Sequence, residues 1–154
     1  MRKLLILAAV LFLASCADED KQDRVINVVD GDTFDILRGG DQEITIRLYG
    51  VDCPESTQPY GDKVTQWLQD RISQETVEIK KVEEGNYGRT IAKVYHNDQM
   101  INELLVQNGL AWVYNRYCDQ AICDDWQTIQ QEKRQNEVGL WQQGNPEPPW
   151  EYRD

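Results

Sequence analysis

Histidine is almost absent from this chain, since His96 is the only one among 154 residues. It stands at the end of a predicted strand, and we interpret it as a solvated or structural side chain. A single, isolated imidazole argues against histidine-dependent catalysis, including that of the Ser-His-Asp hydrolases. It also argues against a zinc site, because zinc needs several Cys or His ligands and the chain has no second Cys pair.

Long hydrophobic runs are also missing. The apolar stretch Leu4–Leu13 reaches only about half of the ~20 residues that a membrane-spanning helix requires. Arg2 and Lys3 precede it, and this order is typical of a secretory signal peptide. We therefore expect the first residues to direct export and to take no part in the fold.

The residues around Cys16 set the expected location of the protein. Leu13-Ala14-Ser15-Cys16 resembles the bacterial lipoprotein box, so we expect residues 1–15 to be removed and Cys16 to carry lipid. The alternative is an ordinary signal peptide with an incidental Cys. Residues 16–23 are short and charged and read as a tether. These features predict a lipid-anchored protein of the bacterial cell envelope, either periplasmic or at the outer membrane. Ala17, which follows the Cys, weakly favours the outer membrane.

Three cysteines remain after Cys16, and export would place them in an oxidising compartment. Cys118 and Cys123 lie five residues apart in a polar segment, so we predict a disulfide between them. Two reduced thiols, or a bridge involving Cys53, are the alternatives.

Basic residues are scarce. The chain carries 16 Lys and Arg against 27 Asp and Glu, and loss of Arg2 and Lys3 would leave a net charge of 14 − 27 = −13. Most nucleic-acid-binding proteins are basic, because neutralising phosphates supplies much of their affinity. Either the partner is not a nucleic acid, or binding depends on a cation and a small local basic cluster.

Alternating apolar residues predict a β-rich fold. Two alternating segments flank Asp30-Gly31-Asp32 and predict a hairpin, because Asp-Gly tolerates the positive φ of a tight turn. A third strand carries Ile44, Ile46 and Leu48 on one face. The five predicted strands are Val25–Val29, Thr33–Leu37, the strand containing Ile44–Leu48, Thr76–Val82 and Thr90–His96.

Helical spacing predicts three helices, at residues 60–72, Ile101–Gln107 and Asp124–Glu137. From Gln142 onward the chain is Pro-rich, and we predict an extended tail over residues 142–154. The order of elements indicates an α+β fold, mainly β, in which a five-stranded OB-type barrel carries three helices on its outside. This domain would span residues 24–141.

Charged side chains cluster where the predicted strands end. Strand parity puts Ile46 and Leu48 in the core, so Arg47 points away from it. Asp52 and Glu55 then follow on an irregular segment that Pro54 stiffens. One guanidinium near two carboxylates suits a site that holds both a phosphate and a metal ion, although a surface salt bridge is an equally good reading of this stretch alone.

Several blocks of the sequence together resemble the staphylococcal nuclease family. The resemblance covers about residues 24–141, in the expected order, and each block is weak singly. The blocks are Asp30-Gly31-Asp32-Thr33, Arg47 with Val51-Asp52-Cys53-Pro54-Glu55, Tyr87-Gly88-Arg89, Met100–Val106, Gly109-Leu110-Ala111 and Gly139-Leu140-Trp141. The closing Pro148–Arg153 also resembles the tails of exported bacterial members.

This resemblance implies an OB-fold, calcium-dependent phosphodiesterase that cleaves DNA and RNA and leaves 3′-phosphate ends. Asp32, Asp52 and the backbone carbonyl of Cys53 would bind Ca²⁺, a cation that prefers such hard oxygen ligands. Position 53 is a departure, since the family's type enzyme has Thr there. The other roles are implied as follows: Glu55 as general base, Arg47 and Arg89 on the scissile phosphate, and Tyr87 and Tyr117 on the nucleotide.

Two other functions stay open at this point. The chain could be a non-catalytic OB barrel that binds single-stranded nucleic acid or a protein. It could also be a structural envelope lipoprotein whose carboxylates merely bind calcium. The full set of charged positions favours the enzyme, because a calcium-binding structural protein needs no pair of arginines beside its acids. We expect a monomer with nucleic acid as substrate, held at the membrane by its lipid.

Overall fold

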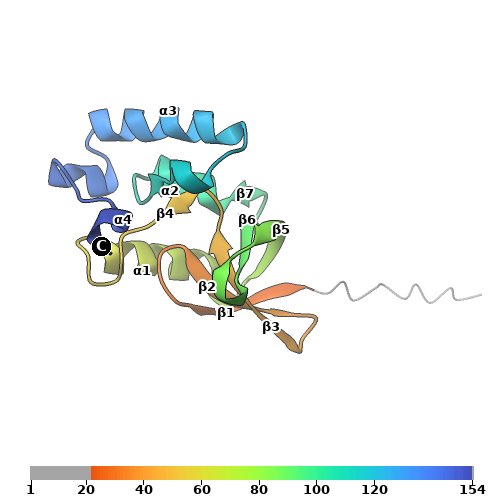
Figure 1. The fold of residues 1–154 in the computed structure, drawn as a ribbon. Helices are drawn as coiled ribbons and strands as arrows, with labels where there is room; N and C mark the ends of the chain where they lie inside the picture. The colour runs from red at the N-terminus through yellow and green to blue at the C-terminus, as the bar shows by residue number, and fades with distance from the viewer. Residues whose placement is uncertain (1–21, 154) are drawn as a thin grey trace, which may run out of the picture.

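The computed structural model describes residues 22–153 and shows the predicted β-rich domain (Figure 1). The proposed signal peptide, Cys16 and most of the tether lie outside these residues. The five long strands are β1 (Asp23–Val28), β2 (Thr33–Arg38), β3 (Gln42–Leu48), β5 (Thr76–Glu84) and β6 (Thr90–His96). All five predicted strands are therefore confirmed, with ends that differ by a few residues.

These strands close into a barrel. Their order is β3-β2-β1-β5-β6, and β6 returns to pair in parallel with β3, which leaves none of the five without two neighbours. The pairs β1–β2, β2–β3, β1–β5 and β5–β6 are antiparallel. This is the predicted five-stranded OB-type arrangement. Alternate residues such as Phe34, Ile36, Ile46 and Leu48 are fully buried and fill the interior.

The hairpin tip between β1 and β2 is confirmed, but the reason given for Gly31 was wrong. Gly31 does not have a positive φ. Instead, a Cβ at this position would lie 2.7 Å from Val64 Cγ1 and 2.8 Å from Cys53 Cβ. Glycine is needed because the tip packs closely against a helix and against the segment after β3.

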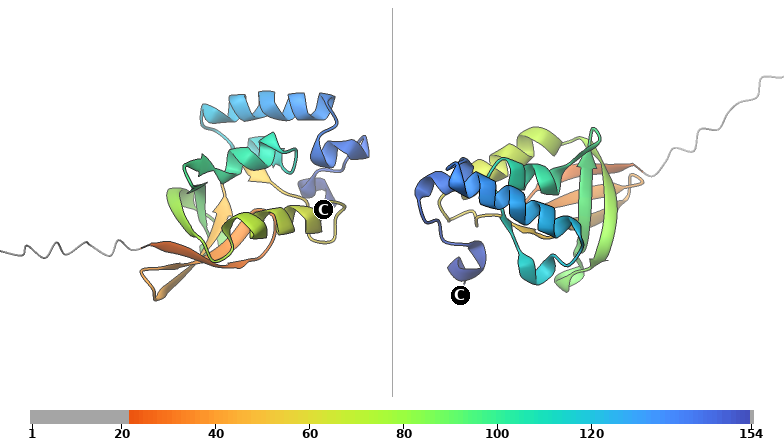
Figure 2. Two further views of the ribbon diagram at one scale, coloured as in Figure 1. Left: turned by 180° about the vertical axis from the view of Figure 1, so that it is seen from behind. Right: turned by 90° about the horizontal axis from the view of Figure 1, so that it is seen from above.

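Three helices pack outside the barrel, as predicted: α1 (Gly61–Ile72), α2 (Ile101–Gln107) and α3 (Ile122–Gln135). Figures 1 and 2 show α3 lying over α2, with α1 along another side of the barrel. α1 buries Val64, Leu68 and Ile72 at helical spacing. Each such side chain stabilises the fold by roughly 1.5–3 kcal/mol relative to full exposure.

Smaller elements complete the domain. β4 (Val51–Asp52) pairs with β8 (Trp112–Val113), and β7 (Gln99–Met100) extends the sheet beside β6. Short 3₁₀ turns cover Asn86–Gly88, Asn115–Tyr117 and Gly139–Gln143. Cys118 and Cys123 are joined by a disulfide, with their Cα atoms 5.7 Å apart. Within residues 22–153, no helix has the length and apolar character needed to cross a membrane.

The predicted extended tail after Gln142 is wrong. The segment turns and ends in a short helix, α4 (Pro149–Tyr152), which lies against the body of the domain (Figure 1). Pro149 occupies the first helical turn, where its missing N–H is no loss. The Trp150 ring stacks on Tyr114 with ring centroids 4.8 Å apart and an interplanar angle of 3°. This stacking, which the Pro-rich composition does not reveal, holds the tail in place.

Candidate active site

Two buried aspartates form the base of the site. Asp32 follows the hairpin tip, and Asp52 belongs to β4; both are at most 1% exposed. The Cys53 N–H donates to Asp32 Oδ2 at 2.7 Å, and the Thr33 hydroxyl donates to Asp32 Oδ1 at 3.2 Å. Because buried carboxylates must be compensated, these two imply a nearby positive charge.

Arg47 supplies that charge. It lies in β3 with Ile46 and Leu48 on either side facing the core, so parity turns its side chain outward, as predicted. Its Nη1 donates to Asp32 Oδ1 and its Nη2 donates to Asp52 Oδ1 at 2.6 Å. One planar guanidinium thus connects two carboxylates that are 20 residues apart in sequence. The two Nη groups of a planar guanidinium suit such a bridge.

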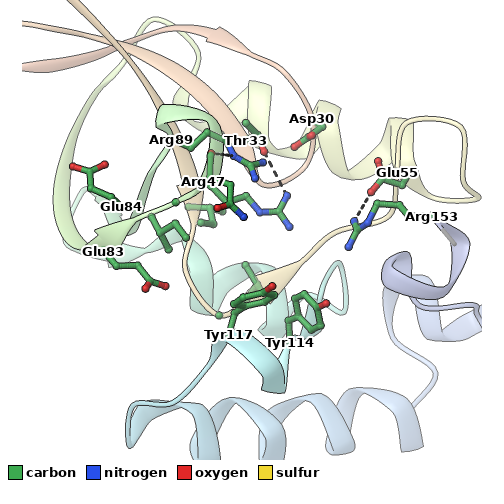
Figure 3. Close-up of a pocket in the computed structure, with 16 residues that line it drawn as sticks. Asp30, Thr33, Arg47, Glu55, Glu83, Glu84, Arg89, Tyr114, Tyr117 and Arg153 are labelled. Carbon is green, nitrogen blue, oxygen red and sulfur yellow. Dashed lines mark hydrogen bonds and ion pairs between the residues drawn. The ribbon is translucent and has the colours of Figure 1, made fainter.

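Arg47 faces a pocket of about 570 Å³ (Figure 3). Figure 3 shows the Arg47 and Arg89 side chains lying together on one side, with Tyr114 and Tyr117 on the opposite wall. The polar and aromatic side chains of the lining come from six separate stretches of the chain. They are Asp30, Thr33, Arg47, Glu55, Glu83, Glu84, Asn86, Arg89, Tyr114, Tyr117 and Arg153.

Of the other predicted site residues, Arg89 and Tyr117 line the pocket and Tyr87 does not. Arg89 directly precedes β6, and its Nε donates to the Asn86 carbonyl at 3.3 Å. Tyr117 is half-exposed and contacts Tyr114 edge to face, with ring centroids 5.0 Å apart. Tyr87 is 97% exposed and lies outside the pocket lining. The structure therefore groups Tyr117, and not Tyr87, with the arginines.

Glu55 sits at the other end of the pocket, between β4 and α1. Its Oε1 accepts a hydrogen bond from Arg153 Nη1 at 2.5 Å, and Arg153 Nη2 donates to Asp52 Oδ2 at 2.7 Å. The hydrogen bond with Asp52, followed by that with Glu55, raises the pKa of Arg153 and keeps it charged. Sequence reasoning missed Arg153. The only available signal was the closing Pro148–Arg153 block.

Cys53 lies behind the site. Its thiol is buried and donates to the Gly31 carbonyl at 3.3 Å. Burial raises the pKa of this thiol well above its usual value, with Arg47 opposing the effect. Cys53 is thus an unreactive packing group, while its backbone is placed next to Asp32 by the hydrogen bond to that carboxylate.

Asp30 adds a further carboxylate at the hairpin tip. It is half-buried, and its Oδ1 accepts the Asp32 N–H at 3.0 Å. Burial raises its pKa, while the charges of Arg47 and Arg89 and hydrogen bonds with Thr33 act in the opposite direction. Asp30 and both arginines line the same pocket.

The donors present fit a hard divalent cation. Asp32 and Asp52 offer carboxylate oxygens, and the Cys53 segment offers a backbone carbonyl. Within residues 22–153, no cluster of three or more Cys, His, Asp or Glu side chains is placed to bind a metal. A cation here would therefore take two side-chain ligands and complete its shell with backbone and water oxygens.

The balance of charge in the pocket is close to neutral. Three arginines line it, against the four acids Asp30, Glu55, Glu83 and Glu84. The chain as a whole carries a net charge of −11. The site can grip an anion locally, yet the molecule gives it little long-range attraction.

Comparison with known proteins agrees with this geometry. The family of staphylococcal nuclease homologues matches residues 45–143. An "Uncharacterized endonuclease" of Haemophilus influenzae is 34% identical, over 99% of this chain and 85% of its own length. A "Micrococcal nuclease" of Shigella flexneri is also 34% identical, over 95% of this chain and 88% of its own. "Staphylococcal-like nuclease CAN1" of Arabidopsis thaliana is 37% identical over 73% of this chain and 34% of its own length.

The barrel holds two arginines, Arg47 and Arg153, against the carboxylates of Asp32, Asp52 and Glu55. Nuclease relatives match nearly the whole length of the chain. Together these findings define a class of nucleic-acid hydrolases. The chain belongs to the staphylococcal nuclease family, and its general function is that of a nuclease.

Proposed function

We propose that this protein is a calcium-dependent endonuclease that hydrolyses phosphodiester bonds of DNA and RNA and leaves 3′-phosphate ends. The observation that carries the proposal is the guanidinium of Arg47. It binds both buried aspartates and also faces the pocket that Arg89 and Glu55 line. This arrangement supports a site that would hold a cation and an anion side by side, as a phosphodiester and its metal require.

Asp32, Asp52 and the Cys53 carbonyl would hold the calcium ion. Bound there, Ca²⁺ would neutralise charge on the phosphate and lower the pKa of a coordinated water. Asp32 is fixed for this role by the Cys53 N–H and by Thr33. Asp52 is fixed by its place in the β4–β8 pair and by Arg47. These contacts hold both carboxylates in place before a ligand arrives, and the guanidinium groups of Arg47 and Arg153 would shift from the oxygens that the cation takes.

Arg47 and Arg89 would bind the oxygens of the scissile phosphate. During hydrolysis, negative charge builds on these oxygens. Two guanidinium groups stabilise that charge more strongly in the transition state than in the ground state. Arg89 is suited to the task because its only hydrogen bond in the described part of the chain uses Nε, which leaves both Nη groups for a ligand.

Glu55 would act as the general base. Arg153 engages its Oε1, and we assign Oε2 to the proton of the attacking water. The side chain is one-third exposed at the pocket, so a water molecule can reach it. Tyr117, with Tyr114 packed against it, would contact the nucleotide through its ring face. Tyr87 is exposed outside the pocket and would touch the strand beyond the cleaved bond.

The experiment is a cleavage assay with the protein lacking residues 1–15, on denatured DNA and on RNA, in calcium or in EGTA. Product ends are identified by whether they need phosphatase treatment before 3′ extension. We expect cleavage of both polymers in calcium only, with blocked 3′ ends. Strand binding without cleavage would instead support a non-catalytic OB module, and cleavage that persists in EGTA would exclude the calcium dependence.

We also propose that the mature protein starts at lipidated Cys16 and acts as a monomer at the cell envelope. The lipid anchor rests on the Leu13–Cys16 pattern, and the monomer is an expectation from the sequence. Labelling with radioactive palmitate tests the lipid, with Cys16→Ser as control. Equal labelling of both proteins, or of neither, would reject the anchor.

A further inference from the structure

The C-terminal segment is attached to the domain at three points before it reaches the pocket. Trp150 stacks on Tyr114, as described above. The Tyr152 hydroxyl lies 3.1 Å from the Thr57 hydroxyl and donates to the Thr57 carbonyl at 3.2 Å. The Glu147 carbonyl accepts from Gln58 Nε2 at 2.6 Å. Two of these three attachments end on the segment that carries Glu55.

These attachments also act on Glu55 itself. Gln58, which holds Glu147 through Nε2, accepts the Glu55 N–H through Oε1 at 3.1 Å. A Cβ on Gly61 would lie 1.9 Å from the Glu55 carbonyl, so the backbone of Glu55 packs closely against the start of α1. The backbone of Glu55 is thus fixed from two sides, whereas its side chain is one-third exposed.

Arg153 holds the side chain of Glu55 in place. Its Nη1 binds Glu55 Oε1 at 2.5 Å and Asp52 Oδ1 at 3.2 Å, while its Nη2 binds Asp52 Oδ2 at 2.7 Å. Because a guanidinium is rigid and planar, a fork fixed on buried Asp52 also fixes the position of the Nη1 that holds Glu55. Figure 3 shows this pair at the end of the pocket that faces the Arg47 guanidinium.

We propose that Arg153 is a positioning residue for Glu55, and that residues 147–153 belong to the active site because they hold Arg153 in place. The inference rests on the proposed function, because it assigns Arg153 to the general base named there. Arg153 bonds Oε1 and directs Oε2 toward the water. Through this contact the last residues of the chain set the rate of the chemical step.

The test compares single-turnover cleavage by wild type and Arg153→Met, in calcium, on one single-stranded oligonucleotide. We expect the cleavage rate to fall on the order of 10- to 100-fold, because misplacing a catalytic group by about 1 Å has effects of this size. Strand affinity should change little. Arg38→Met is the matched control, since Arg38 also binds one carboxylate, Asp23, with two nitrogens, and lies outside the pocket lining.

Two further variants separate positioning from mere folding. Trp150→Ala removes the stacking on Tyr114 and leaves Arg153 intact, so it should lower the rate in the same direction. For Arg153→Ala, added guanidinium ion should restore part of the rate, whereas tetramethylammonium at equal ionic strength should not. A variant that is merely unstable cannot be rescued in this selective way.

The decisive comparison is a double-mutant cycle with Glu55→Gln. If Arg153 acts through Glu55, then Arg153→Met should have little further effect in the Glu55→Gln background. An equal loss in both backgrounds, or no loss in a wild type that cleaves, would overturn the positioning role.

A second measurement does not need activity. The side-chain carboxyl ¹³C resonance of Glu55, assigned by its loss in Glu55→Gln, should shift in Arg153→Met and not in Arg38→Met. An inactive wild type that shows this shift would refute the proposed function while retaining the contact. An unchanged resonance would refute the contact itself.

Discussion

Replacing Arg47 with Met tests whether one guanidinium holds the two buried aspartates together. The side chain is 19% exposed, and its partners Asp32 and Asp52 are 2% and 0% exposed at their side chains. Met keeps the length of the aliphatic stem and removes the charge. Asp32 then stays out of water without a cationic partner, which is a costly arrangement, whereas Asp52 keeps its contact with Arg153.

The size of the effect follows from this burial. Removing one partner of a buried ion pair typically costs about 3–5 kcal/mol, because the remaining charge is left uncompensated. For a domain of this size, each kcal/mol lowers the melting temperature by ~2–4 °C. The expected shift is therefore on the order of 10 °C. In Arg38→Met, whose arginine is 35% exposed, the loss should be about 0–1 kcal/mol.

Thermal unfolding in EGTA, followed by circular dichroism, measures the shift. Repeating it with calcium adds a second expectation, since a cation bound to Asp32 and Asp52 would replace the missing charge and reduce the difference. The cleavage rate should fall at least 10²-fold, as for loss of a preorganised donor. If Arg47→Met melts within the range of Arg38→Met, the two aspartates do not depend on Arg47 and the reasoning is wrong.

Three further outcomes are expected from the same geometry. Arg89→Met should lower the cleavage rate by about 10²-fold or more while unfolding like wild type, because Arg89 makes one exposed hydrogen bond to Asn86; a matching loss of stability would assign it a structural role. Cleavage should fall less steeply with added NaCl than in a basic nuclease, since the net charge is −11; a steep fall would reveal a basic binding surface. Cys53 should resist iodoacetamide at pH 8 in the folded protein, because burial raises its thiol pKa and the unreactive protonated form persists there; rapid labelling of native protein would contradict its burial.

Most of the fold was predictable because its signals are local. The alternation at Phe34, Ile36, Ile46 and Leu48 reports directly which face of each strand enters the barrel. The same alternation predicts that Arg47 points outward. Elements with a clear period therefore came out right in type and nearly right in length.

The tail was mispredicted for the opposite reason. Three prolines within residues 146–149 indicate an extended chain when only neighbours are considered. The helix α4 and its position depend on Tyr114 and Thr57, which are about 36 to 95 residues away along the sequence. Contacts of that separation leave no periodic signal, so Arg153 could not be assigned to the pocket from its own surroundings.

Gly31 shows that a correct element can rest on a wrong reason. Asp-Gly predicted the hairpin through positive φ, whereas the structure needs glycine there for its contact with Val64 and Cys53. That contact brings the hairpin tip against the segment after β3, and so places Asp32 beside the backbone of Cys53. The packing of one glycine thus contributes to the geometry of the carboxylate pair.

The rate of single-turnover cleavage by Glu55→Gln, compared with wild type in calcium, tests most directly whether this pocket performs the chemistry. Gln preserves the shape of the side chain and cannot accept the proton from water. We predict unchanged binding of the strand and a rate lower by about 10²- to 10⁴-fold. Equal rates in the two proteins would contradict it and would place the reaction elsewhere on the molecule.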